Sequence, residues 1–129
     1  MKQRCVLLGN VTGINRELYN IVYEGTVSLV EEVDEIPEFE VLFAGIPVQS
    51  FLVAGKGTVK EMNPFNDLMS VIRVRRPNKV VIENVYALQL YQKGRMLERI
   101  KNALVNEGYK VSQEKDLQTR RFYVNAVAA

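Results

Sequence analysis

The residues best suited to chemistry lie in two short segments, each directly after an apolar run. Residues 41–44 are apolar and lead into the loop 45–51, and a second apolar run ends at Glu83 and Asn84. In open α/β sheets, ligands bind beyond the carboxyl ends of the strands. If both runs are strands of one sheet, the 45–51 loop and the Glu83 carboxylate face the same crevice, where they could bind a ligand.

Other residue types narrow the chemistry. The chain has no histidine and one cysteine, Cys5. An internal disulfide is impossible, a zinc or haem site is not expected, and the commonest general base near neutral pH is missing. Cys5 belongs to an apolar run, and buried structural thiols are usually inert. On residue type alone, Glu83 could equally be a solvated carboxylate or one that binds backbone N–H groups of the next turn.

Length and composition describe the molecule that must position these residues. The chain has 129 residues, of which 47% are hydrophobic and 25% charged, and this usage is typical of one globular domain over residues 1–129. No apolar run approaches the roughly 20 residues that span a bilayer. The apolar run at residues 5–8 is too short for a signal peptide. We therefore expect a soluble cytoplasmic domain that does not enter a membrane.

Apolar periodicity and turn residues predict the elements that carry the two segments. Strands are predicted at residues 5–8, 41–44, 79–83, 109–112 and 121–127, and helices at residues 14–23, 64–76 and 94–107. The helix at 64–76 has the clearest signals, since Asn63 suits its N-cap and Pro77 follows its end. Alternating strands and helices are typical of a parallel α/β sheet with right-handed crossovers.

Charge is distributed unevenly along the chain. Residues 1–40 hold three basic and eight acidic residues, a net charge of −5, whereas residues 41–129 hold fourteen and seven, a net charge of +7. The basic residues gather at Arg73, Arg75, Arg76, Lys79, Arg120 and Arg121. Such a group can attract phosphate backbones with weak, salt-sensitive affinity, although charge alone favours an ordinary solvated surface.

Three motifs, in order, resemble DNA cytosine-5 methyltransferases. Residues 43–51 read Phe-Ala-Gly-Ile-Pro-Val-Gln-Ser-Phe, with Ala-Gly at 54–55, and resemble the catalytic loop, which normally contains Pro-Cys-Gln. Residues 80–85 end in Glu-Asn-Val and resemble the strand that carries this motif in the family. Residues 118–120 look like the start of its Gln-x-Arg-x-Arg strand, although Phe122 stands where the second arginine would be. The resemblance covers roughly residues 34–124.

The resemblance implies a role for each matching residue. In the family a cysteine thiolate adds to C6 of a flipped-out cytosine, so that C5 can accept a methyl group from S-adenosylmethionine. Val48 occupies the position of that nucleophile and cannot add to the base, and Pro47 and Gln49 flank it as substrate-binding positions. Glu83 corresponds to the glutamate that holds the N3 edge of the base. Asn84 and Arg120 match the neighbouring substrate-binding and catalytic positions.

The resemblance also implies a fold and a cofactor. It implies a Rossmann-like, mostly parallel α/β sheet with flanking helices, comprising the middle and later part of a methyltransferase catalytic domain. The family binds S-adenosylmethionine at a Gly-rich turn, but Gly9 and Gly13 have the wrong spacing for it, and Thr26 stands where the family has an aspartate. The later part is also shortened before residue 118. We therefore expect no cofactor in the isolated chain.

Three functions fit these observations. The first is a catalytically inactive homologue that retains weak DNA or partner binding. The second is one subunit of a split methyltransferase whose second chain supplies the cofactor and recognition parts. The third is a structural or assembly protein, for example a homo-oligomer, that kept only the fold. We expect the first, because a split enzyme leaves Val48 unexplained.

Overall fold

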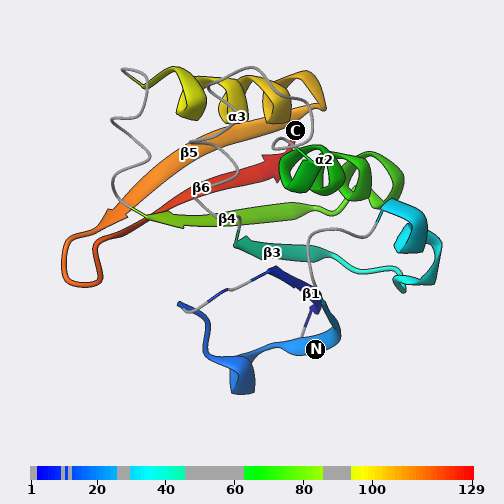
Figure 1. Cartoon of the computed structure of the whole chain (residues 1–129). Helices are drawn as coiled ribbons and strands as arrows, with labels where there is room; N and C mark the ends of the chain where they lie inside the picture. The colour runs from blue at the N-terminus through cyan, green and yellow to red at the C-terminus, as the bar shows by residue number, and fades with distance from the viewer. Residues whose placement is uncertain (1–2, 10, 12, 26–29, 46–62, 86–93) are drawn as a thin grey trace.

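The computed structural model describes residues 3–9, 11, 13–25, 30–45, 63–85 and 94–129. Six strands form one sheet in the order β2-β1-β3-β4-β6-β5 (Figure 1). The strands are β1 (Arg4–Gly9), β2 (Asn20–Gly25), β3 (Val41–Gly45), β4 (Lys79–Val85), β5 (Tyr109–Asp116) and β6 (Arg121–Ala128). Strands β2, β1, β3 and β4 are parallel, and β6 is antiparallel to both β4 and β5. The expected mostly parallel α/β sheet is confirmed.

The centre of the sheet is built from the predicted apolar runs. Every residue of β3 is buried, as are the four central residues of β1. Strands buried on both faces have no polar alternation, so a continuous apolar run is the expected sequence for them. The strands predicted at 5–8, 41–44 and 79–83 are confirmed, each extended by one or two residues.

Two α-helices, α2 (Asn63–Arg75) and α3 (Arg95–Asn106), cover one face of the sheet (Figure 1). Their apolar stripes share a core with one face of β1, β3, β4 and β6. In α2 the buried residues are Phe65, Leu68, Met69, Val71 and Ile72, and in α3 they are Met96, Leu97, Ile100 and Leu104. Both predicted helices are confirmed to within a residue or two at each end.

The prediction of a helix at residues 14–23 is wrong. The segment instead forms a short 3-10 helix, η1 (Arg16–Leu18), followed by β2. Asn15 caps η1, because its side chain accepts a hydrogen bond from the Glu17 backbone N–H at 3.1 Å. The β-branched and aromatic residues at 21–23 favour a strand, and β1 offers them an edge to pair with. Pairing with β1 therefore outweighs the helical periodicity of this segment.

The last two strands form a hairpin that is longer than predicted. β5 continues to Asp116, four residues beyond its expected end. The Asp116 side chain then accepts hydrogen bonds from the backbone N–H groups of Gln118 at 3.0 Å and Thr119 at 3.3 Å. These bonds close the turn, and Arg120 completes it with a left-handed φ of 57°.

The other face of the sheet is covered by the connection between β1 and β2, residues 11 and 13–19, which we call the covering segment. Val11, Ile14 and Tyr19 pack on a second apolar cluster formed by the strands. The Tyr19 ring meets the Phe43 ring edge-on, with centroids 5.0 Å apart. A second helix N-terminal to α2 is also present, the 3-10 helix η2 (Val30–Glu35).

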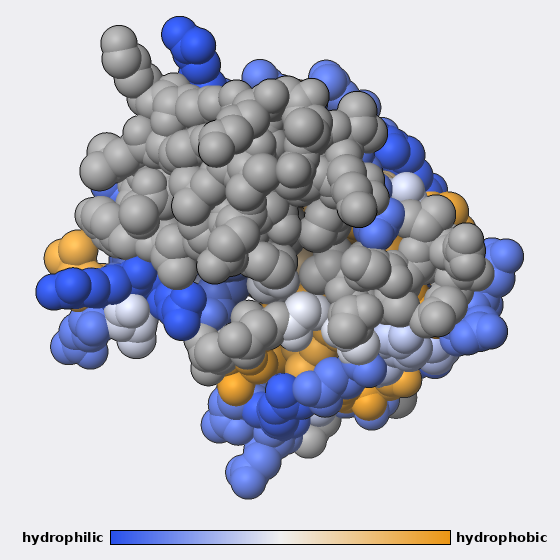
Figure 2. All heavy atoms as spheres, viewed as in Figure 1, coloured by the Kyte–Doolittle hydropathy of each residue, from blue (hydrophilic) through white to orange (hydrophobic). Residues whose placement is uncertain are grey.

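None of the helices in the described ranges is both long and apolar enough to cross a bilayer. Figure 2 shows one side of the molecule, where hydrophobic residues lie in small groups among hydrophilic ones. Scattered apolar groups of this kind are ordinary on folded domains.

Candidate functional site

Three strands end side by side at the carboxyl edge of the sheet. In the strand register, Gly9 of β1 pairs with Gly45 of β3, Gly45 pairs with Glu83 of β4, and Glu83 pairs with Tyr123 of β6. The chain order changes direction between β1 and β3, so this edge includes the switch point where α/β sheets bind ligands. The predicted meeting of Glu83 with the start of the 45–51 loop is confirmed.

Glu83 is not a solvated carboxylate. Its side chain is only 3% exposed and lies on the sheet face beneath the covering segment. Its Oε2 accepts a hydrogen bond from the Gly13 backbone N–H at 3.0 Å, and its Oε1 lies 3.7 Å from Arg121 Nε. A buried carboxylate is costly unless it is paired and hydrogen-bonded, and these two groups meet that need.

The covering segment approaches the sheet most closely at Gly13. A Cβ placed on Gly13 would overlap the Tyr123 hydroxyl oxygen and lie 3.4 Å from Glu83 Oε2. Burial raises the pKa of Tyr123, and the negative charges of Glu83 and Asp116 raise it further. The phenol therefore stays protonated at neutral pH, next to the buried carboxylate. The absence of a side chain at position 13 is what allows this contact.

Beneath the covering segment is a cavity of about 250 Å³. Its lining includes Glu83 and Tyr123 together with the apolar side chains of Ile14, Phe43 and Val81. Sites for drug-sized ligands usually have volumes of about 300–1,000 Å³. The cavity that the described residues enclose on this face is smaller than that range.

Asn84 lies on the opposite face of β4 from Glu83, since successive strand residues alternate. It is 2% exposed, and its Nδ2 donates a long hydrogen bond of 3.5 Å to the Ile82 carbonyl. Its Oδ1 is buried and has no hydrogen-bond partner in the described part of the chain. The structure thus separates Asn84 from Glu83, although the two are adjacent in sequence.

The arginine that meets Glu83 is Arg121, where the motif had indicated Arg120. Arg120 is exposed in the turn before β6, whereas Arg121 begins the strand and pairs with Val85. Positions 121 and 123 share the sheet face of Glu83, which places the Arg121 guanidinium beside the carboxylate. The strand predicted at 121–127 begins at the right residue, but its pairing with β4, which brings Arg121 to the Glu83 face, has no signal in the sequence. The other predicted positions, Pro47, Val48 and Gln49, lie outside the described residues.

Most residues of the predicted phosphate-binding group form ion pairs or hydrogen bonds with other residues of the chain. Arg73 Nε and Arg76 Nη1 bind the Glu107 carboxylate at 2.8 and 2.9 Å, and Arg76 Nη2 also donates to the Glu107 carbonyl. Arg75 donates to two carbonyl oxygens of η2, each at 3.2 Å. These three arginines tie the end of α2 to its neighbours, and the expectation that they contact DNA stays a prediction.

Comparison with known proteins finds a matching family and several relatives. Residues 15–117 match the family model described as C-5 cytosine-specific DNA methylase. The chain is 33% identical over 121 residues to the type II methyltransferase M.BanI of Aneurinibacillus aneurinilyticus, covering 87% of this chain and 27% of that protein. It is 36% identical over 105 residues to M.HpaII of Haemophilus parainfluenzae, covering 78% and 29%. The chain spans less than a third of the length of these relatives.

Solved structures resemble the fold. The fibrillarin pre-rRNA processing protein of Methanococcus jannaschii superposes with a TM-score of 0.62 at 8% identity, covering 98% of this chain and 66% of that chain. A putative DNA modification methyltransferase from an Escherichia coli prophage gives a TM-score of 0.62 at 14% identity, covering 97% and 46%. At these identities the likeness concerns the fold alone, which is Rossmann-like.

Proposed function

Because the chain belongs to the C-5 cytosine-specific DNA methylase family, we propose that it is a catalytically inactive member that retains weak, sequence-independent DNA binding. Val48 carries this proposal, since it stands where the matching motif has the cysteine nucleophile. An isopropyl group has no lone pair and cannot add to C6 of a cytosine. Cys5 does not replace it, because its thiol is buried in β1 and burial raises its pKa.

The environment of Glu83 supports the same proposal. A carboxyl group can hold the N3 edge of a base only if an oxygen is free to face that base. In this chain Gly13 N–H binds Oε2 and Arg121 lies beside Oε1, and the covering segment leaves the side chain 3% exposed. Base binding would have to displace the covering segment first.

The test is methyl transfer from tritiated S-adenosylmethionine to mixed-sequence duplex DNA. We expect no incorporation by the wild-type chain, and none by Val48→Cys. The substitution restores the attacking group, but positioning of the methyl donor can account for about 7–11 kcal/mol of a barrier. Cysteine and valine have similar sizes, so the variant should fold. Incorporation by the wild type would overturn the inactive assignment, and incorporation by the variant alone would reveal a working cofactor site.

DNA binding is tested separately by fluorescence anisotropy with two labelled duplexes of unrelated sequence. Non-specific binding usually has dissociation constants of about 10⁻⁴–10⁻⁶ M at physiological salt. We expect values in this range, equal for both duplexes and weaker at higher salt. Failure to bind at low salt would favour the structural or assembly protein instead.

A split methyltransferase is the second candidate. The chain spans 27% and 29% of M.BanI and M.HpaII, and in a split enzyme a companion chain would supply the parts that this chain does not match. That companion would also have to supply the nucleophile that Val48 lacks. Co-purification of a second chain with a Gly-rich cofactor motif, and methylation by the pair, would support the split enzyme over the inactive one.

A further inference from the structure

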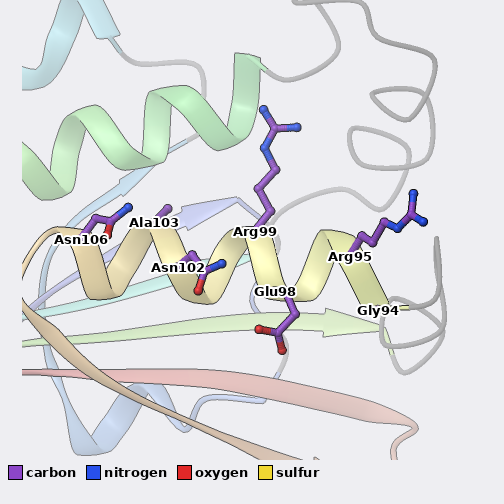
Figure 3. A pocket seen from close by; sticks show the side chains of 7 residues that line it. All are labelled: Gly94, Arg95, Glu98, Arg99, Asn102, Ala103 and Asn106. Atoms are coloured by element: carbon purple, nitrogen blue, oxygen red, sulfur yellow. The ribbon is translucent and has the colours of Figure 1, made fainter.

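A groove of about 520 Å³ follows the outward face of α3 (Figure 3). It is lined by two arginines and two asparagines, Arg95, Arg99, Asn102 and Asn106. Their spacing of four, three and four residues places all of them on one side of a helix with 3.6 residues per turn. The opposite side of α3 holds the apolar residues that pack on the sheet. The four residues form a polar stripe along α3, and Ala103 lies beside this stripe in the groove lining.

The two arginines of this stripe differ from those at the end of α2. Arg95 and Arg99 are exposed, and neither forms an ion pair within the described ranges, whereas Arg73 and Arg76 are both bound to Glu107. No carboxylate of the described residues lies within ion-pair distance of either guanidinium group. The groove contains one carboxylate, Glu98, which is bound to Lys101 at 3.2 Å. The groove therefore carries a net positive charge.

The start of α3 contributes further donors to the same groove. Gly94, which lines the groove, is the N-cap residue, has a left-handed φ of 84° and provides no side-chain hydrogen bond to the first turn. The first backbone N–H groups of a helix have no partner within the helix and favour anions. Arginine and asparagine side chains together with helix N-termini are among the groups that bind DNA phosphates.

We propose that the α3 groove binds the sugar-phosphate backbone of DNA. This inference rests on the proposed DNA binding and assigns it to a surface. The stripe from Arg95 to Arg99, Asn102 and Asn106 is about 16 Å long at 1.5 Å per residue. One DNA strand places a phosphate about every 3.4 Å along its axis, so the stripe can follow several phosphates of that strand. Contacts of this kind position a protein on DNA without reading its sequence.

The test compares two double variants that each remove two positive charges. Arg95→Gln with Arg99→Gln changes the groove. Arg4→Gln with Lys110→Gln is the matched control, because both residues are exposed at the amino ends of β1 and β5 and lie outside the groove. Each protein is titrated with a labelled duplex at several salt concentrations, and circular dichroism verifies that each is folded.

We expect the groove variant to lower the slope of log K against log salt by about 2, one for each lost phosphate contact, and the control to leave it unchanged. Binding at low salt should weaken about tenfold in the groove variant. If the wild type binds DNA and the two variants behave alike, the α3 assignment is wrong while DNA binding stands. If the wild type does not bind DNA, both proposals fall. Displacement of DNA by poly-glutamate at equal charge concentration would indicate an acidic protein partner and also overturn the assignment.

Discussion

The contact between the covering segment and the sheet can be tested at Gly13. The Cβ of Gly13→Ala would overlap the Tyr123 hydroxyl oxygen, so either the ring or the covering segment must move. Overpacking of this kind typically costs about 1–3 kcal/mol. Gly13 does not have a left-handed φ, so the cost is steric and does not come from the backbone conformation. We expect the free energy of unfolding to fall by an amount in that range.

Tyr123→Phe provides the matched background. Once the hydroxyl is removed, the nearest atoms to the new Cβ are the ring carbon Cζ and Glu83 Oε2, each 3.4 Å away, which is close to ordinary van der Waals contact. Gly13→Ala should therefore cost less than about 1 kcal/mol in the Tyr123→Phe protein, giving a clear interaction energy in the double-mutant cycle.

The assay is urea unfolding of all four proteins at pH 7, with unfolding free energies obtained by linear extrapolation. The slope with urea should be the same for each, since the surface exposed on unfolding hardly changes. If Gly13→Ala leaves the unfolding free energy of the wild-type background unchanged, the close approach of Gly13 to Tyr123 is refuted. An equal cost in both backgrounds would show that the Tyr123 hydroxyl is not the obstacle.

Three further predictions concern the helix ends and the cofactor. Tyr109→Phe should lower the unfolding free energy by about 1–3 kcal/mol in urea titrations, because the buried Pro77 carbonyl loses a hydrogen bond of 2.6 Å. Arg73 and then Arg76 lower the pKa of Glu107 from its usual 4.5, so the stability from these pairs is present above that value and is lost as pH falls through the lowered pKa. Glu107→Gln should flatten the pH dependence of the melting temperature below pH 4.5, and an unchanged profile would contradict the pairing. Calorimetry should detect no micromolar binding of S-adenosylmethionine to the chain, and such binding would reveal a cofactor site beyond the 250 Å³ cavity.

The basic residues illustrate how charge along a sequence can mislead. Arg73 and Arg76 belong to the most basic stretch of the chain, yet both are bound to Glu107, more than thirty residues away. Arg95 and Arg99 do not form a basic run in the sequence, because Glu98 lies between them. Folding pairs the first two arginines with Glu107 and leaves the second two without an ion pair among the described residues. The surface available to an anion therefore follows from which charges find partners, and this is decided by contacts distant in sequence.

The sequence by itself determined the centre of the fold and the position of Glu83. The apolar runs that became β1, β3 and β4 and the stripes of α2 and α3 are local patterns, and each reports burial directly. The rule that parallel strands end at one edge then placed Glu83 opposite Gly45. The resemblance to the family depends on residue order alone, and the match over residues 15–117 confirmed the family.

Only the tertiary structure decided what surrounds Glu83. Residues 20–25 form a strand because the edge of β1 supplies partners that no local pattern contains. Arg121, and not Arg120, lies beside Glu83 because the register of β4 and β6 places Tyr123 opposite Glu83, and a shift of one residue would reverse the faces. Gly13 meets Glu83 across seventy residues, and a glycine in a loop gives no sign of such a partner. Local sequence specifies which residues are buried, whereas pairing between distant segments specifies which polar groups they meet.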